Sequence, residues 1–479
     1  MRNTLEGRVP EAMGRSSSIL AIDLGTTRCK AAVYDFGGSM LASVSRERDG
    51  DGPAGGIDPN VARWKRDVAW CARSAVKAAR REIDRIVITG QGSSAIWLDE
   101  QGELVRPVIL HTDMRTVSQA EALTREFESI GYVPSKVYPS LLWLKENEKS
   151  KFMSIRHVLD IRQFIGYRLT GEMRYDTRSF TKLENEKFAA MCGLDPEVFG
   201  EPHDYSKPIG FLRDSMAEAI ELPRGVPVFV GPMDGLCGII GSGIHEEGQM
   251  TDLAGSTEVM ATPVPRGSKL AMLTLLDTGI DLFYTSPPFG LAYNWFLDRF
   301  YPGKKSAYKA IASDVSESSA DLDRPFYIPG LKPMGPQRSL RSAFFNLALN
   351  HSRGDMARAL FEGIAFEVAR VVDRLGEEGV SIGEIRLSGG GAYQEVWNQM
   401  RADATGKEVV LPRVLETSSL GAAIVAASSS MGPYKGVEEG MSKMVKMGKR
   451  YRPRKAAVEA YRERLVMHRR YADLLAGTW

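Results

Sequence analysis

The chain has 479 residues, which is too long for one ordinary hydrophobic core, so at least two domains are expected. Hydrophobic residues make up 43% and charged residues 25%, as in soluble globular proteins, and a net charge of +2 argues against nucleic acid or a membrane as the main partner. The four widely spaced cysteines form no CxxC pair and the six histidines form no HExxH motif, so we expect a cytoplasmic location and no structural zinc site.

The N-terminal part of the chain begins with a polar stretch, residues 1–17, which we expect to be a disordered arm because it lacks the apolar core of a secretory signal. No apolar run reaches the ~18 residues of a membrane-spanning helix. The next residues predict a mixed α/β layer. The expected elements are strands at 19–22, 31–34, 40–45 and 86–89 and a helix at 58–81.

A similar order of elements returns in the second half of the chain. Residues 248–261 read as two strands around a Gly-Ser-Thr turn, and residues 385–388 read as a strand that ends in three glycines. Helices are expected at 355–376, 395–405 and 419–428. The repetition predicts two related domains, 18–236 and 237–479, with the boundary in the glycine-rich stretch 231–243 and a central cleft.

Two turns carry hydroxyl groups suited to phosphate. In the first, Gly25 allows close backbone approach, the hydroxyls of Thr26 and Thr27 can donate to phosphate oxygens, and Asp23 can hold magnesium. The same turn is equally consistent with a plain hairpin and a capped aspartate. The second turn, Gly255–Thr257, is a weaker signal alone and gains weight as a partner of the first.

Asp234 follows an expected strand at 226–230 and is surrounded by glycine, without an oppositely charged neighbour in sequence. Such a carboxylate can accept the proton of a hydroxyl that attacks phosphorus. The alternative is a helix N-cap, and the two interpretations are compatible.

Three further segments have residue patterns that could form binding sites. The glycines at 389–391 can admit a nucleotide or form a flexible loop, and Asp113 with Arg115 can bind sugar hydroxyls or form a surface ion pair. Gly90–Ala95 matches GxGxxA, but residues 95–102 read as a strand and hairpin turn, so we reject a dinucleotide site. The sequence contains no GxxxxGK[ST] phosphate loop.

Taken in order, these segments resemble the FGGY carbohydrate kinases, which share a superfamily with actin and the large heat-shock chaperones. The resemblance extends over residues 18–430 and includes the Leu169–Gly171 turn, Gly193–Asp195 and the helix around Ala359–Phe366. Departures lie on the sugar side, where Gly92-Ser93-Ser94 stands in place of Met-His-Gly. They bear on the substrate and leave the reaction class intact.

The resemblance implies an α/β fold of two ribonuclease H-like (actin-like ATPase) domains and an ATP- and Mg²⁺-dependent kinase that acts on a small sugar or polyol. The favoured substrate is a ketopentose such as D-xylulose, with gluconate, glycerol and erythritol as alternatives. A chaperone-like regulatory ATPase and a sugar sensor without transfer activity remain open, and a homodimer is possible. The residues implied are Asp234 as general base; Asp23 for metal; Gln91, Gly92, Asp113, Arg115 and Asp234 for substrate; and Gly25, Thr26, Thr27, Gly255, Ser256, Thr257, Gly389, Gly390, Gly391 and Asn398 for ATP.

Overall fold

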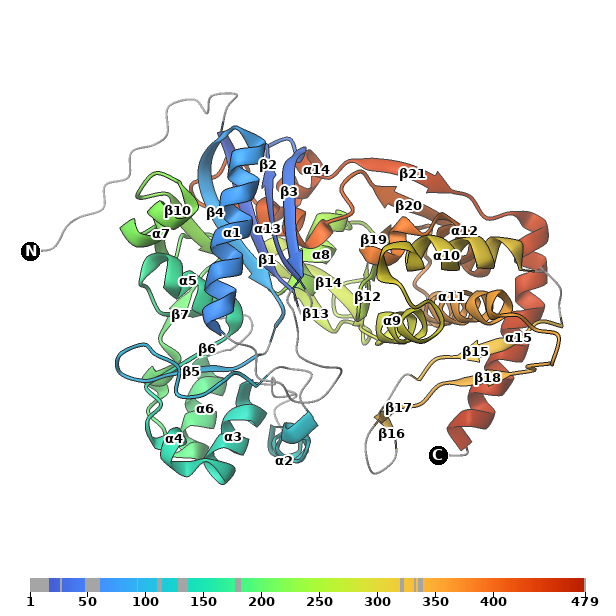
Figure 1. The fold of residues 1–479 in the computed structure, drawn as a ribbon, viewed down its shortest axis with the longest axis horizontal. Coiled ribbons are helices and arrows are strands. Elements are labelled where there is room, and N and C mark those ends of the chain that lie inside the picture. Colours follow the sequence, from blue (N-terminus) through green and yellow to red (C-terminus); the bar gives the residue numbers. More distant parts are fainter. Residues whose placement is uncertain are drawn as a thin grey trace, which may run out of the picture. The chain divides into compact units, whose positions relative to one another are not determined.

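The computed structural model describes residues 17–25, 28–47, 61–92, 94–109, 114–127, 137–176, 182–318, 323–330, 333–334 and 339–477. The chain forms two compact units (Figure 1). The first contains the residues up to Gly241 together with Ser418–Met444, and the second contains Ser242–Thr417 and Val445–Trp479. Thr26, Thr27 and Asp113 lie outside the described residues.

The first unit is built on a six-stranded mixed sheet, and its central strand is flanked by a hairpin partner on one side and a parallel strand on the other. The strands β1 (Ser17–Leu24), β4 (Glu82–Gly90) and β10 (Pro227–Val230) are parallel neighbours, so their carboxyl ends meet at one edge of the sheet. The strand order is β3 (Met40–Glu47), β2 (Arg28–Tyr34), β1 (Ser17–Leu24), β4 (Glu82–Gly90), β10 (Pro227–Val230) and β9 (Gly210–Phe211).

Helices cover both faces of this sheet. Alternate strand residues such as Leu20 and Ile22 enter one buried core with three helices: α1 (Val61–Ala79), α5 (Ile161–Thr170) and α7 (Asp214–Ile220). The strands supply near-continuous apolar runs, as sheets covered on both sides require. The other helices of this unit's sheet are α8 (Asp234–Ser242), α13 (Thr417–Ala427) and α14 (Val437–Met444). Tyr34 and Ser419 join β2 to α13 through a 2.7 Å hydroxyl–hydroxyl bond.

A smaller lobe of the same unit has its own apolar core around Trp97 and Tyr138. Its strands and 3-10 turns are β5 (Ile96–Leu98), β6 (His157–Leu159), β7 (Arg174–Asp176), β8 (Glu201–His203), η1 (Met114–Thr116) and η3 (Pro196–Phe199). Its helices are α2 (Val117–Phe127), α3 (Val137–Asn147), α4 (Lys149–Met153) and α6 (Lys182–Cys192).

The second unit has a seven-stranded sheet whose centre repeats the first. In the sheet, the antiparallel hairpin β11–β12 lies beside two further strands, β19 and β20, that run parallel to β11. In the first unit the hairpin β1–β2 lies beside β4 and β10 in the same way. The order is β13 (Leu273–Leu275), β14 (Ile280–Thr285), β12 (Glu258–Pro263), β11 (Gln249–Ala254), β19 (Glu384–Ser388), β20 (Glu408–Pro412) and β21 (Met447–Tyr451).

A large apolar core joins this sheet to the helices of the second unit. They are α9 (Phe289–Phe300), α10 (Lys304–Glu317), α11 (Arg353–Glu377), α12 (Glu395–Thr405) and α15 (Lys455–Gly477). The small strands are β15 (Phe326–Ile328) with β18 (Ala343–Phe345) and β16 (Pro333–Met334) with β17 (Ser339–Leu340), and the 3-10 turns are η4 (Leu276–Thr278) and η5 (Gly390–Tyr393). Figure 1 shows α11 beside α12, and the two helices pack together.

The predicted elements are confirmed in type, with ends shifted by a few residues. The helix expected at 58–81 is described from Val61 to Ala79, and the helix expected at 419–428 begins at Thr417. Ile96–Leu98 is a strand followed by a tight turn at 99–103, as the rejection of a dinucleotide site required. Within the described residues, no helix combines the length and apolar character needed to cross a membrane.

Candidate active site

The carboxyl ends of β1, β4 and β10 bring three predicted segments of the first unit together. Asp23 at the end of β1 lies beside Thr89 in the parallel register of β4. The backbone N–H of Gln91 donates to the carbonyl of Leu24 (2.9 Å), and the Thr89 hydroxyl donates to the carbonyl of Pro232 (2.7 Å). The sheet therefore gathers Asp23, Gln91 and the loop before Asp234, although they come from distant parts of the sequence.

Asp234 is the first residue of α8, and its Oδ1 accepts a bond from the N–H of Gly235 (2.8 Å). The helix begins here because the Cys237 N–H bonds to the carbonyl of Met233, one turn earlier. Among the described residues no ion pair shorter than 4 Å involves Asp234. Burial raises the pKa of Asp234, against the opposing effects of the Gly235 bond and of Arg162 and Lys30. The group is thus a carboxylate with more basic character than usual.

Arg162, at the start of α5, is completely buried. Its Nε donates to Oδ2 of Asp160 (3.0 Å), and its Nη1 donates to the carbonyl of Gly231 (2.9 Å), where the loop to Asp234 begins. Asp160 also caps α5 by accepting from the N–H groups of Arg162 and Gln163. Helix α5 thus fixes a cation beside the loop that carries Asp234.

Asp23 is buried and shares its surroundings with Asp234. Both carboxylates add to the raised pKa of Cys237, which burial brings to about 12. The Asp23 carboxylate beside the Gly25 turn fits a magnesium ion, which usually takes one or two carboxylates and completes its shell with water and phosphate oxygens. No cluster of three acidic, histidine or cysteine ligands occurs in the described parts of the chain.

The remaining first-unit candidates are placed as follows. Gly25 closes the β1–β2 hairpin, and its N–H bonds to the carbonyl of Arg28 (3.0 Å). Gln91 is 2% exposed, and among the described residues neither end of its amide has a hydrogen-bond partner. Gly92 follows it at the edge of the sheet. Arg115 lies in η1, with its guanidinium 5.3 Å from the ring centre of Trp143 on α3.

The second unit brings together two predicted ATP segments. Gly255, Ser256 and Thr257 form the turn between β11 and β12, with Gly255 and Thr257 exposed. Gly389 follows the parallel neighbour β19 and has a φ of +83°, and a Cβ there would lie 2.9 Å from the carbonyl oxygen of Ala254. The triple-glycine loop therefore lies against the residue that precedes the hydroxyl-bearing turn.

Asn398 is completely buried on α12, behind the glycine loop. Its Nδ2 donates to the carbonyl of Ala392 (2.7 Å), whereas its Oδ1 has no hydrogen-bond partner in the described ranges of the chain. The side chain thus supports the loop that contains Gly390 and Gly391.

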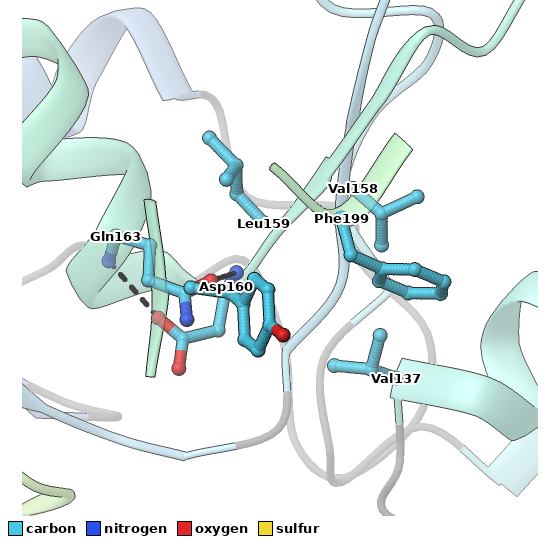
Figure 2. A pocket seen from close by; sticks show the side chains of 7 residues that line it. Val137, Val158, Leu159, Asp160, Gln163 and Phe199 are labelled. Atoms are coloured by element: carbon cyan, nitrogen blue, oxygen red, sulfur yellow. Dashed lines mark hydrogen bonds between the residues drawn. The ribbon is translucent and has the colours of Figure 1, made fainter. Parts of the chain in front are cut away.

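A small pocket beside α5 is lined by Asp160, Gln163, Tyr175 and four apolar side chains (Figure 2). The dashed lines in Figure 2 are the bonds of the α5 cap between Asp160 and Gln163. Its volume of about 10 Å³ has room for about one water molecule. It is too small for a sugar or a nucleotide, and the chemistry-bearing residues lie outside it.

Sequence reasoning missed Arg162, Thr89 and Met233. An Asp-x-x-Gln capping box at 160–163 announced the start of α5, but nothing in the sequence shows that Arg162 points to the Gly231 carbonyl. Such contacts depend on tertiary packing.

Residues 18–241 match the N-terminal domain of the FGGY family of carbohydrate kinases, and residues 293–430 match the C-terminal domain of that family. Xylulose kinase of Bacillus subtilis (strain 168) is 25% identical over 476 residues, which cover 93% of this chain and 94% of that protein.

Two solved structures share the fold. The crystal structure of xylulose kinase from Rhodospirillum rubrum has a TM-score of 0.76 and 23% identity, covering 96% of this chain and 98% of its own. The crystal structure of gluconate kinase from Lactobacillus acidophilus has a TM-score of 0.80 and 19% identity, with the same two coverages. These similarities confirm the predicted α/β fold with two actin-like ATPase domains.

Proposed function

Since the chain belongs to the FGGY family of carbohydrate kinases, we propose that it transfers the terminal phosphoryl group of ATP to a hydroxyl of a ketopentose such as D-xylulose, with Asp234 as general base. In this reaction the substrate oxygen forms a bond to phosphorus while the bond from phosphorus to the departing ADP oxygen breaks. The hydroxyl proton passes to Asp234.

The observation that carries the proposal is the environment of Asp234. The carboxylate stands at the carboxyl edge of parallel strands, where its loop is bonded to Thr89 at the end of β4. Its raised pKa favours proton acceptance. The positive charges of Arg162 and Lys30 oppose that rise and favour the ionised form that a general base needs.

The first unit supplies the acceptor residues Gln91, Gly92 and Arg115, and the turn at Gly25 contributes to phosphate binding. The hydroxyls of Ser256 and Thr257 and the loop Gly389–Gly391 are assigned to ATP, with Asn398 behind them. Asp23 would hold Mg²⁺, which neutralises phosphate charge when bound.

The ketopentose is favoured because the Bacillus subtilis relative is named a xylulose kinase. The fold is shared with a gluconate kinase, so a sugar acid is the comparison substrate.

A coupled ADP-release assay over pentuloses, polyols and sugar acids tests the proposal. We expect D-xylulose or another pentulose to stimulate ADP release at least tenfold over ATP alone. ADP release that no acceptor stimulates would point to a regulatory ATPase. A preference for gluconate, glycerol or erythritol would keep the kinase activity and reject the ketopentose.

A further inference from the structure

Gly92 and Met233 compete for one volume in the first unit. A Cβ built on Gly92 would lie 1.9 Å from Sδ and 2.8 Å from Cγ of Met233, which is too close for atoms that are not bonded to each other. The neighbouring atoms belong to the end of a flexible side chain and not to the backbone. A side chain at position 92 is therefore possible only when Met233 moves away.

This volume borders the candidate acceptor residues. Met233 directly precedes Asp234, and Gly92 directly follows Gln91. Both Gly92 and Met233 are half-buried, so the volume they share is partly open. Gln91, in contrast, is buried, and neither end of its amide has a hydrogen-bond partner within the part of the chain that the structure describes, whereas buried amides in folded proteins nearly always have one. A polyhydroxylated ligand would supply donors and acceptors to both ends of that amide.

We infer that Met233, seated over Gly92, forms an apolar wall of the acceptor site and selects short acceptors of about five carbons over longer ones. The inference rests on the proposed function and names the residues that set its substrate range. A thioether offers no strong hydrogen bond, so this wall selects by size and by contact with the carbon face of the substrate.

Removal of the wall should change the ratio of two specificity constants. We expect Met233→Ala to raise kcat/KM for six-carbon D-gluconate, relative to five-carbon D-xylulose, by about tenfold, since one to a few methylene groups discriminate by 10–200-fold. Met233→Leu keeps most of the volume and should leave the ratio within about twofold of wild type. Met153→Ala, at a position 65% exposed on α4, is the matched control and should leave it unchanged.

The steric coupling is tested separately by a double-mutant cycle. Gly92→Ala alone should lower kcat/KM for the best acceptor by about tenfold, and Gly92→Ala in the Met233→Ala background should cost much less. Thermal unfolding of each variant shows whether it is folded, and the substrate ratio does not depend on the amount of active protein.

The outcomes separate the inference from the proposed function. An active enzyme whose ratio is unchanged in Met233→Ala, with additive effects in the cycle, would overturn the inference alone. A wild-type protein that phosphorylates no acceptor would overturn the proposed function and the inference together. A changed gluconate-to-xylulose ratio in Met233→Ala, together with non-additive effects in the Gly92/Met233 cycle, supports both the proposed function and the inference.

Discussion

The Nη1 of Arg162 donates a 2.9 Å hydrogen bond to the carbonyl of Gly231, which ties the start of α5 to the loop that ends at Asp234. The guanidinium is completely buried and is balanced by Asp160. Its positive charge lowers the pKa of Asp234, as does that of Lys30, while burial raises it. Arg162 thus holds the loop from Gly231 to Asp234 in place and lowers the pKa of the Asp234 carboxylate.

Replacement of Arg162 should move the pH profile. A general base must be ionised, so kcat/KM falls as the pH decreases through the pKa of Asp234. Without the cation this pKa rises further, and the acidic limb should shift to higher pH. Arg162→Gln alone would leave the buried Asp160 carboxylate without its positively charged partner. The variant to measure is therefore the charge-balanced Asp160→Asn/Arg162→Gln. Arg168→Gln on the same helix should keep the wild-type profile; a similar shift there would refute the assignment.

Asp234→Asn should lower kcat by about two to four decades while ATP still binds, because only the proton acceptor is lost. Turnover by the coupled assay and ATP affinity by calorimetry check this. A raised pKa means that the ionised carboxylate destabilises the folded state above that pKa, so the variant should unfold at a Tm no lower than wild type at neutral pH. Asp214→Asn, at an exposed position on α7, serves as the control. Near-normal turnover in Asp234→Asn would rule out Asp234 as the general base.

Asp23→Ala should raise the Mg²⁺ concentration needed for half-maximal activity, since the residue is assigned to the metal. The measurement is a magnesium titration at fixed ATP. Glu47→Ala, at the exposed end of β3, should behave like wild type. An unchanged metal dependence in Asp23→Ala would argue against the assignment.

Gly389 and Gly390 are a matched pair in the loop that is proposed to bind ATP. Gly389 has a φ of +83° and contacts the Ala254 carbonyl, whereas a Cβ at Gly390 would meet that oxygen only at 3.9 Å. Gly389→Ala should destabilise the protein by about 1–3 kcal/mol, because an alanine at this positive φ is strained, while Gly390→Ala should leave the stability close to wild type. Urea unfolding compares the stability of the two variants. Equal losses of stability would show that the positive φ of Gly389 is not the cause.

Glu362 on α11 is buried among the guanidinium groups of Arg324, Arg358 and Arg464. Burial raises the pKa of Glu362, but the surrounding arginines outweigh it and leave the pKa below its usual value. Its stabilising effect is therefore present above the unfolded-state pKa and is lost as the pH falls through the folded-state value.

Glu362→Gln should therefore cost about 3–5 kcal/mol, because buried cations lose their partner. Urea unfolding at pH 7 measures this loss, and the difference from wild type should shrink in acid. Glu377→Gln, exposed near the end of the same helix, is the control. A loss no larger than that of the control would contradict the proposed role of the cluster.

The elements were predictable where the pattern is local. Ile19–Ile22 and Ala31–Tyr34 are apolar runs around a glycine turn, and they form the β1–β2 hairpin because short-range pairing needs little else. Asp234 was identified as a site residue because a carboxylate at a strand end has no partner nearby in sequence.

The contacts that tune the site were not predictable. Arg162 donates a hydrogen bond to Gly231, 69 residues further along the chain. Glu362 forms ion pairs with Arg324, just before β15, and with Arg464 on α15. The grouping of Ser418–Met444 with the first unit likewise depends on packing, through bonds such as that from Arg85 to the carbonyl of Ala426. A single sequence gives no sign of which distant side chains share a core.

In each sheet a hydroxyl at the end of a central strand forms a hydrogen bond near the start of a helix, to a backbone carbonyl in one sheet and to another hydroxyl in the other. Thr89, at the end of β4, donates to the carbonyl of Pro232 ahead of α8, and Ser388, at the end of β19, bonds to Thr417 at the start of α13. Thr89 pairs with Asp23, but Ser388 pairs with Leu253. One scaffold thus exists in two copies, and only one copy carries acids at these positions. Duplication followed by divergence would leave this asymmetry, in which one half carries acids at these positions and the other half does not.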